Sequence, residues 1–167
     1  MNLTELFLAD LDREAGANRR VLERVPLGQP DWKPHEKSMA LGYLATLVAT
    51  MPSWIALIID QDEFDLRPQG APPSRPPQPT TTQELLESLD KSVAKGRQAL
   101  SQTTDEHLMK NWRLLVTGQV IDERPRYVMI QDSVFGHLAH HRGQLTVYLR
   151  LTGALVPAIY GPSADEA

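Results

Sequence analysis

The strongest helical pattern in this sequence reads Phe135-Gly-His-Leu-Ala-His-His-Arg-Gly-Gln-Leu-Thr-Val-Tyr-Leu-Arg150. Leu145 and Tyr148 recur at the spacing of one face of an α-helix, and an apolar face of this kind points into a protein core. His137 and His141 are four residues apart, so their side chains leave the helix on that same inward face. The segment therefore predicts a core helix that carries two histidines toward the interior.

Helix signals on either side place this helix among three others. It is expected to run from about 126 to 151, after Pro125 and before Gly153. The other three helices are predicted from Asn2 to Pro26, from about 39 to 60, and from a capping box at Thr81 to about 103. Pro52 should kink the second of these near residue 48, because proline removes a backbone hydrogen bond.

The connections between the helices suggest the topology. Residues 67–79 hold six of the thirteen prolines, and a polyproline-like strand of that length reaches ~40 Å. It can therefore return along a whole helix and leave the second and third helices parallel; a ligand segment for an SH3-type domain is the alternative interpretation. Residues 112–122 predict a small hairpin around Thr117-Gly118, and the tail 156–166 is expected to fold back across a bundle end.

These elements predict an all-α fold: a four-helix bundle with crossover connections, the second and third helices parallel, and a small β-hairpin between the third and fourth. At 167 residues the chain is expected to form a single domain, residues 1–167.

Composition limits the classes of function. Hydrophobic content of 41% and charged content of 23% are ordinary for a globular protein. A net charge of −4 argues against nucleic acid as a partner. No apolar run of ~18 residues suggests a membrane span, and no signal peptide is expected, so cytoplasmic residence is predicted. The absence of cysteine excludes disulfides, thiolate ligands and a cysteine nucleophile.

The two inward histidines suggest a metal site. Imidazoles at this spacing can converge on one divalent ion, whereas the alternative is a pair of core histidines hydrogen-bonded to their neighbours. Glu14 lies close to the apolar stripe of the first helix. It is either a boundary residue with a solvated tip or a carboxylate offered to an internal cavity, where it could complete a two-histidine site of the kind that ferrous iron uses.

Several motifs together resemble the DinB-like family over nearly the whole chain. They are Lys37-Ser-Met-Ala-Leu-Gly-Tyr-Leu-Ala45, Met51-Pro-Ser-Trp54, His140-His-Arg-Gly-Gln-Leu145, Val156-Pro and Tyr160-Gly-Pro-Ser163. The resemblance implies a four-helix bundle, frequently a homodimer, in which three histidines bind zinc, nickel or a similar divalent ion. It also implies a relation to transferases that use the low-molecular-weight thiols bacillithiol or mycothiol. Two of the three ligands map onto His137 and His141, and the remaining one maps onto position 47, which here is leucine.

Two hypotheses follow. In the first, zinc, nickel or iron at His137 and His141 lowers the pKa of a thiol or water. That nucleophile attacks a small electrophile oriented by Arg142 or Gln144, in a thiol S-transferase or hydrolase-like reaction. In the second, Leu47 marks a metal-free bundle that serves as a small-molecule binding or dimeric interaction module.

Overall fold

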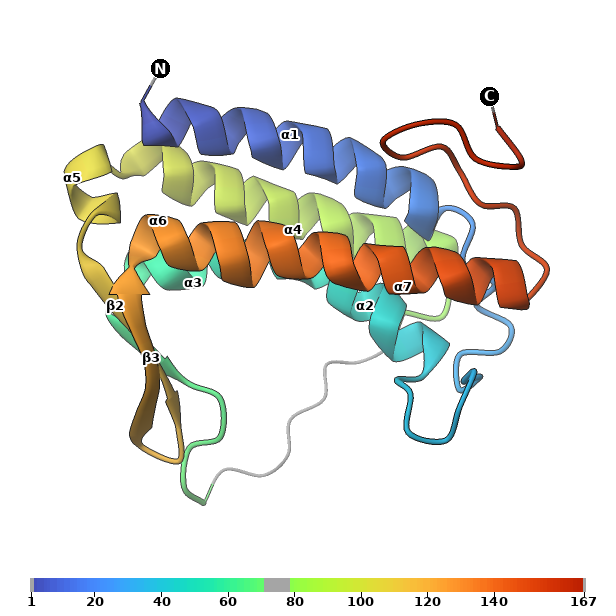
Figure 1. Ribbon diagram of the computed structural model, residues 1–167, viewed down its shortest axis with the longest axis horizontal. Helices are drawn as coiled ribbons and strands as arrows, with labels where there is room; N and C mark the ends of the chain where they lie inside the picture. Colours follow the sequence, from blue (N-terminus) through green and yellow to red (C-terminus); the bar gives the residue numbers. More distant parts are fainter. Residues whose placement is uncertain (1, 71–78, 167) are drawn as a thin grey trace.

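The computed structural model describes residues 2–70 and 79–166, and these are mostly helical (Figure 1). Four long helical segments lie side by side, with a small sheet at one end (Figure 1). The segments are α1 (Leu3–Leu22), α2 (Leu41–Thr50) followed by η1 (Met51–Ser53) and α3 (Trp54–Asp60), α4 (Thr82–Gln102), and α6 (Arg126–Met129) followed by η2 (Ile130–Gly136) and α7 (His137–Leu151). The predicted crossover covers residues 67–79, of which 71–78 lie outside the described residues.

Local capping chemistry sets several helix ends where the sequence predicted them. The Asn2 side chain accepts a hydrogen bond from the backbone N–H of Glu5 at 2.8 Å, and the Glu5 carboxylate accepts from the backbone N–H of Asn2 at 3.2 Å. The Thr81 hydroxyl accepts from the backbone N–H of Glu84. Gly153 follows α7 with φ of 78°, a conformation that glycine adopts without a steric penalty.

The predicted kink in the second helix is present, three residues beyond the expected position. The α-helix ends at Thr50, and a 3₁₀ turn containing Pro52 leads into α3. Ser92 of α4 fixes this turn: its hydroxyl accepts from the backbone N–H of Ser53 at 2.8 Å and donates to the carbonyl of Thr50 at 2.7 Å. A Cβ at Gly96 would stand 2.7 Å from the carbonyl oxygen of Pro52, so only glycine lets α4 approach so closely.

The predicted hairpin is part of a three-stranded sheet. Strands β2 (Asn111–Val116) and β3 (Gln119–Pro125) are antiparallel around Thr117 and Gly118, both with positive φ. Strand β1 (Glu63–Asp65) pairs in parallel with β2 and was not predicted. The Asp65 carboxylate accepts from the backbone N–H groups of Thr117 and Gly118 at 3.0 and 2.6 Å, which joins β1 to the hairpin turn.

Arg126 ties this sheet to the helices. Its side chain is 1% exposed and donates to the carbonyls of Ile58 and Gln61 at the end of α3 and of Asn111 at the start of β2. Because a buried guanidinium needs all its donors satisfied, this residue fixes the position of the sheet against α3.

The fourth helical segment is continuous from Arg126 to Leu151, as predicted, but it is not regular. Residues Ile130–Gly136 form a π-helix, a form that places one extra residue in a turn and is frequent at functional sites. The π-helix was not predicted and directly precedes His137.

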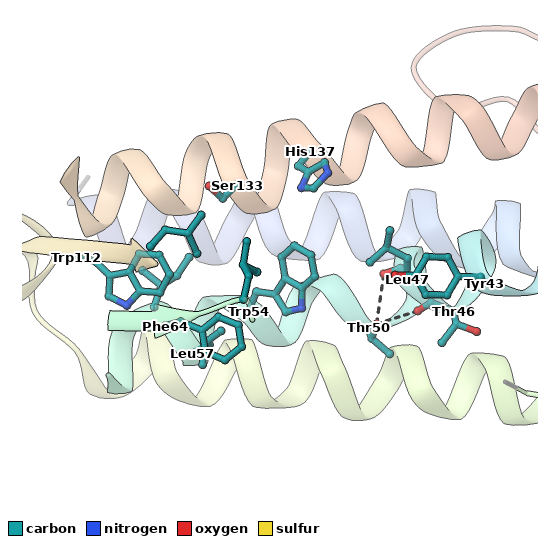
Figure 2. A pocket seen from close by; sticks show the side chains of 13 residues that line it. Tyr43, Thr46, Leu47, Thr50, Trp54, Leu57, Phe64, Trp112, Ser133 and His137 are labelled. Atoms are coloured by element: carbon teal, nitrogen blue, oxygen red, sulfur yellow. Dashed lines mark hydrogen bonds between the residues drawn. The ribbon is translucent and has the colours of Figure 1, made fainter. Parts of the chain in front are cut away.

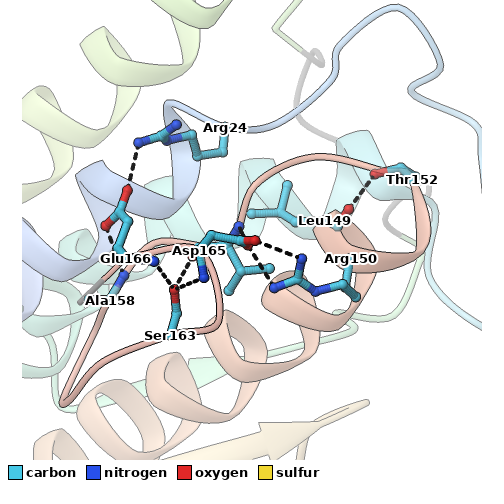
Figure 3. Close-up of polar contacts among 9 residues, drawn as sticks. Arg24, Leu149, Arg150, Thr152, Ala158, Ser163, Asp165 and Glu166 are labelled. Atoms are coloured by element: carbon cyan, nitrogen blue, oxygen red, sulfur yellow. Dashed lines mark hydrogen bonds and ion pairs between the residues drawn. The ribbon is translucent and has the colours of Figure 1, made fainter.

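The C-terminal tail returns over the ends of α1 and α7, as expected (Figure 3). Asp165 pairs with Arg150 of α7 at 2.7 Å, and Glu166 pairs with Arg24 at 2.8 Å. The Ser163 hydroxyl donates to the carbonyl of Val156, which closes the loop between them.

The core forms two apolar clusters, and Trp54 and Val93 pack against both. The segment Leu41–Asp60 is long and apolar enough to span a membrane, with a mean hydropathy of 1.7. However, 67% of that window is buried inside the protein, as in the core helix of a globular fold.

Candidate functional site

His137 and His141 come together as their spacing predicted. Their Nε2 atoms are 2.8 Å apart, and their rings project from the first two turns of α7. Nδ1 of His141 lies 2.9 Å from Oε1 of Gln144. The ring of His137 also hydrogen-bonds the backbone of Ser133, one turn earlier in the π-helix. The third nearby ring, that of His140, lies 5.1 Å from His141 between ring centroids. His137 and His140 are exposed, whereas His141 is buried.

The hydrogen bonds of the pair define its chemistry. With the Gln144 oxygen as acceptor, Nδ1 of His141 is the donor, and a hydrogen bond to the backbone of Ser133 acts to raise the pKa of His137. A neutral imidazole carries one proton, so His141 in this tautomer presents an unprotonated Nε2 to Nε2 of His137, 2.8 Å away. Two lone pairs 2.8 Å apart repel unless a proton or cation lies with them. The two facing nitrogens can therefore share one proton or bind one cation.

The surroundings favour this neutral, ligating form. Burial lowers the pKa of His137, and the neighbouring rings of His141 and His140 lower it further. Burial also lowers the pKa of His141, against a hydrogen bond to Gln144 that acts in the opposite direction. Metal ions bind the deprotonated nitrogen, so a lowered pKa reduces the competition from protons at neutral pH.

The pair supplies two ligands. Within residues 2–70 and 79–166, no group of three or more histidine, aspartate or glutamate side chains could hold a metal ion together. Leu47, at the position where the family resemblance implies a histidine, lines the same cavity as His137. Zinc sites normally use three or more protein ligands, so the two histidines alone form an incomplete donor set.

Glu14 and Arg142 lie in a separate buried arrangement. Their side chains are 4% and 2% exposed, and Oε2 of Glu14 is 2.7 Å from Nη1 of Arg142. The guanidinium also donates to Oδ1 of Asn18 and to the Tyr160 hydroxyl, which in turn donates to Glu14 at 2.9 Å. Glu14 is therefore bound to a cation, and Arg142 has its charge neutralised within the fold.

A cavity of about 620 Å³ adjoins the histidine pair (Figure 2). Helices α2 and α3 form one wall, the sheet forms a second, and η2 with His137 forms a third. The lining residues are Tyr43, Thr46, Leu47, Thr50, Trp54, Leu57, Ile58, Phe64, Leu66, Trp112, Leu114, Ser133 and His137. The volume falls within the range of small-molecule pockets.

Sequence reasoning missed this cavity. In the sequence Trp54 was noted only as part of the motif Met51-Pro-Ser-Trp54, yet its ring centroid lies 6.0 Å from that of His137. Phe64 reaches the cavity because β1 pairs with β2, residues about fifty positions apart along the chain. The aromatic residues themselves were the available signal, but nothing local indicated that they share one cavity.

Comparison with known proteins places these features in a family. The family model described as "DinB family" matches residues 1–167. The chain belongs to the DinB family. The predicted family resemblance is therefore confirmed.

Individual DinB-like relatives agree with this assignment. The chain is 28% identical to YrdA of Bacillus subtilis (strain 168), an uncharacterized protein, over 96% of this chain and 89% of that one. A DinB-like protein from Bacillus cereus ATCC 10987 has the same fold with a TM-score of 0.70, 23% identity and coverage of 93% and 97% of the two chains. The DinB-like protein YjoA from Bacillus subtilis also has this fold, with a TM-score of 0.66 and 17% identity, over 93% of this chain and 98% of that one.

Proposed function

We propose that this DinB-family protein binds one divalent metal ion through His137 and His141 and uses it to activate a thiol or water toward a small electrophile held in the adjoining cavity. The observation that carries the proposal is the pair of Nε2 atoms 2.8 Å apart, with Nδ1 of His141 held by the Gln144 side chain. Zinc, nickel and iron are the ions proposed.

The chain's own residues have defined parts in such a reaction. A divalent ion supplies Lewis acidity, which lowers the pKa of a thiol or water beside it. Gln144 holds the His141 ring in one tautomer, and the Ser133 carbonyl does the same for His137, so both are positioning groups. In the thiol reaction the S–H proton is lost, sulfur bonds to the electrophilic carbon, and the leaving group departs with the bonding electron pair and takes up a proton.

Arg142 has a different part from the one predicted. Its guanidinium is bound to Glu14, Asn18 and Tyr160, so we assign it to the stability of the fold and leave substrate orientation to the cavity walls. The thiol is supplied by a low-molecular-weight compound, because the chain has no cysteine. The proposal includes a homodimeric four-helix bundle with a crossover between parallel helices, in the cytoplasm, with no nucleic-acid or membrane partner.

A metal-free small-molecule binding or dimeric interaction module is the second candidate. The observation in its favour is Leu47, which occupies the cavity wall where a third ligand would stand, while Glu14 is committed to Arg142. In that case the histidine pair shares a proton and the cavity alone carries the function.

Metal titration separates the two candidates. Untagged protein, stripped of metal, is titrated calorimetrically with Zn²⁺, Ni²⁺ or Fe²⁺. One ion per chain is expected, with binding lost in His137→Ala and in His141→Ala. His140→Ala is the matched control and keeps the affinity, because its ring lies outside the facing pair. Absence of stoichiometric binding for all three ions overturns the metal proposal in favour of the second candidate.

Leu47→His tests the geometry further. A third imidazole in the same cavity should raise the affinity for Zn²⁺ about tenfold or more, since zinc sites normally use three or more protein ligands. Val147→His, on the exposed face of α7, adds a histidine away from the pair and should leave the affinity unchanged. An unchanged affinity in Leu47→His would show that position 47 does not face the ion.

A further inference from the structure

The chemistry of the cavity wall identifies a class of ligand. None of the described residues that line the cavity carries an aspartate, glutamate, lysine or arginine side chain. Aromatic rings come from two directions: Trp54 from α3, and Phe64 and Trp112 from the sheet (Figure 2). Aromatic rings attract flat aromatic ligands by offset or edge-on stacking.

The polar groups on the wall are few and uncharged. The hydroxyls of Thr46 and Thr50 donate to the carbonyls of Gly42 and Thr46 within their own helix, at 2.7 and 2.9 Å. Among the described residues, no hydrogen-bond partner is found for the hydroxyls of Tyr43 and Ser133. The wall therefore offers uncharged hydroxyls, which suit carbonyl or ether oxygens of a ligand.

We infer that the cavity binds uncharged, largely aromatic molecules and excludes ions of the same size. With no metal ion bound at His137, a charged group moved from water into this wall would find no counter-ion, and such a transfer is strongly unfavourable. The inference deepens the proposed function, on which it rests for identifying the cavity ligand with the electrophile. It makes that electrophile an uncharged aromatic compound and places the charged parts of any thiol outside the cavity.

The test compares two probes with one skeleton. N-phenyl-1-naphthylamine is uncharged, 1-anilinonaphthalene-8-sulfonate carries a negative charge, and both fluoresce more strongly in apolar surroundings. Titrations of the full chain in the presence of EDTA should show the uncharged probe binding at least about tenfold more tightly, as expected for an apolar wall without a cation. Equal affinities, or tighter binding of the sulfonate, would overturn the inference.

Tryptophan signals locate the probe without a substitution. Trp54 and Trp112 line the cavity, whereas Trp32 packs edge-on against Tyr148 in the other part of the core, with ring centroids 5.5 Å apart. In NMR spectra of the indole N–H groups, the uncharged probe should shift the signals of Trp54 and Trp112 and leave that of Trp32 in place. Shifts confined to Trp32, or equal shifts at all three, would place the probe elsewhere and contradict the inference.

A pair of charge substitutions completes the test. Leu57→Glu puts a carboxylate on the cavity wall and should weaken the uncharged probe at least about tenfold, while Leu151→Glu, on the exposed end of α7, should not. Because EDTA is present, probe binding without metal binding sustains the inference while the metal proposal fails. Metal binding with no probe binding overturns the inference alone.

Discussion

His141 and Arg142 are neighbours on α7, yet they belong to opposite kinds of buried polar arrangement. Arg142 meets a carboxylate at 2.7 Å, and the Tyr160 hydroxyl and the Asn18 oxygen complete its hydrogen bonds. His141 faces another imidazole at 2.8 Å, with no carboxylate within the described part of the site. The first arrangement is electrically complete within the chain. The second joins two imidazoles whose lowered pKa values favour their neutral forms, and it is the one to which we assign the metal ion in the proposed function.

The pKa directions express the same difference. Burial acts to raise the pKa of Glu14, but the hydrogen bond and charge of Arg142 and the hydrogen bonds of Tyr160 and Arg13 together outweigh it, and the net pKa lies below the ordinary 4.5. The carboxylate is thus stabilised in its charged form by a group of the same fold. Burial instead acts to lower the pKa of both histidines, although only His141 is a buried residue by its accessible surface, and a lowered pKa favours the neutral ring.

The largest effect is expected from a substitution that breaks the ion pair between Arg142 and Glu14. Arg142→Met leaves the buried Glu14 carboxylate without its closest cation and with only the exposed Arg13 at 3.3 Å, and loss of one partner of a buried ion pair costs about 3–5 kcal/mol of stability. Urea unfolding followed by circular dichroism measures this loss. Arg150→Met is the matched control, since its partner Asp165 lies at the surface, and it should change stability little.

The dependence of stability on pH tests the same ion pair. Because the folded pKa of Glu14 is depressed, its contribution to stability is complete above about pH 4.5 and is lost as the pH falls through the folded value. The double variant Glu14→Gln/Arg142→Met should recover part of the single variant's loss and lack this acid-dependent component. A double variant no more stable than Arg142→Met would contradict the ion-pair explanation.

An intermediate effect, on metal affinity, is expected at the pair of His137 and His141. Gln144→Leu removes the acceptor that fixes the His141 ring, and loss of such a partner typically weakens metal binding about 10- to 100-fold. Stability should hardly change, because Gln144 is only half-buried. Calorimetric titration with Zn²⁺ checks the affinity, with Gln102→Leu at the exposed end of α4 as control. A large loss of stability with unchanged metal affinity would reverse the roles assigned to the two regions.

The smallest effect on stability is expected at Tyr160, which lies at the edge of the arrangement around Glu14 and Arg142. Tyr160 is 69% exposed overall, but its hydroxyl donates to Glu14 at 2.9 Å. Tyr160→Phe should cost about 1 kcal/mol, because water can replace part of a hydrogen bond that reaches the surface. In a chain of this size the melting temperature then falls by about 2–4 °C. Thermal unfolding measures the shift, and a change in Zn²⁺ affinity would show that the two regions are coupled.

The sequence predicted those features whose causes lie within a few residues. Asn2 and Thr81 cap helices through backbone groups three residues away, and Thr117-Gly118 turns the hairpin through its own dihedral angles. The convergence of His137 and His141 follows from helix geometry alone. In each case the deciding interaction is local, so the residue type is enough.

What escaped prediction depends on contacts between distant segments. Glu14 was considered as a metal ligand, but its partner Arg142 is far along the chain, and nothing in either residue's neighbourhood indicates the pairing. Strand β1 needs β2 to exist as a strand at all. The cavity requires both the sheet and the kinked helix to be in place, so no single segment could show it.

The π-helix of residues Ile130–Gly136 has a consequence for how such a chain can evolve. One residue of an α-helix turns the chain by about 100°. Loss of a single codon in this segment would restore a regular helix and rotate His137 relative to Arg126, which is anchored to the end of α3. Substitutions here alter one side chain, whereas a change of length by one residue alters the direction of every side chain that follows. We therefore expect relatives that share the histidine pair to vary in composition across this turn but to keep its length.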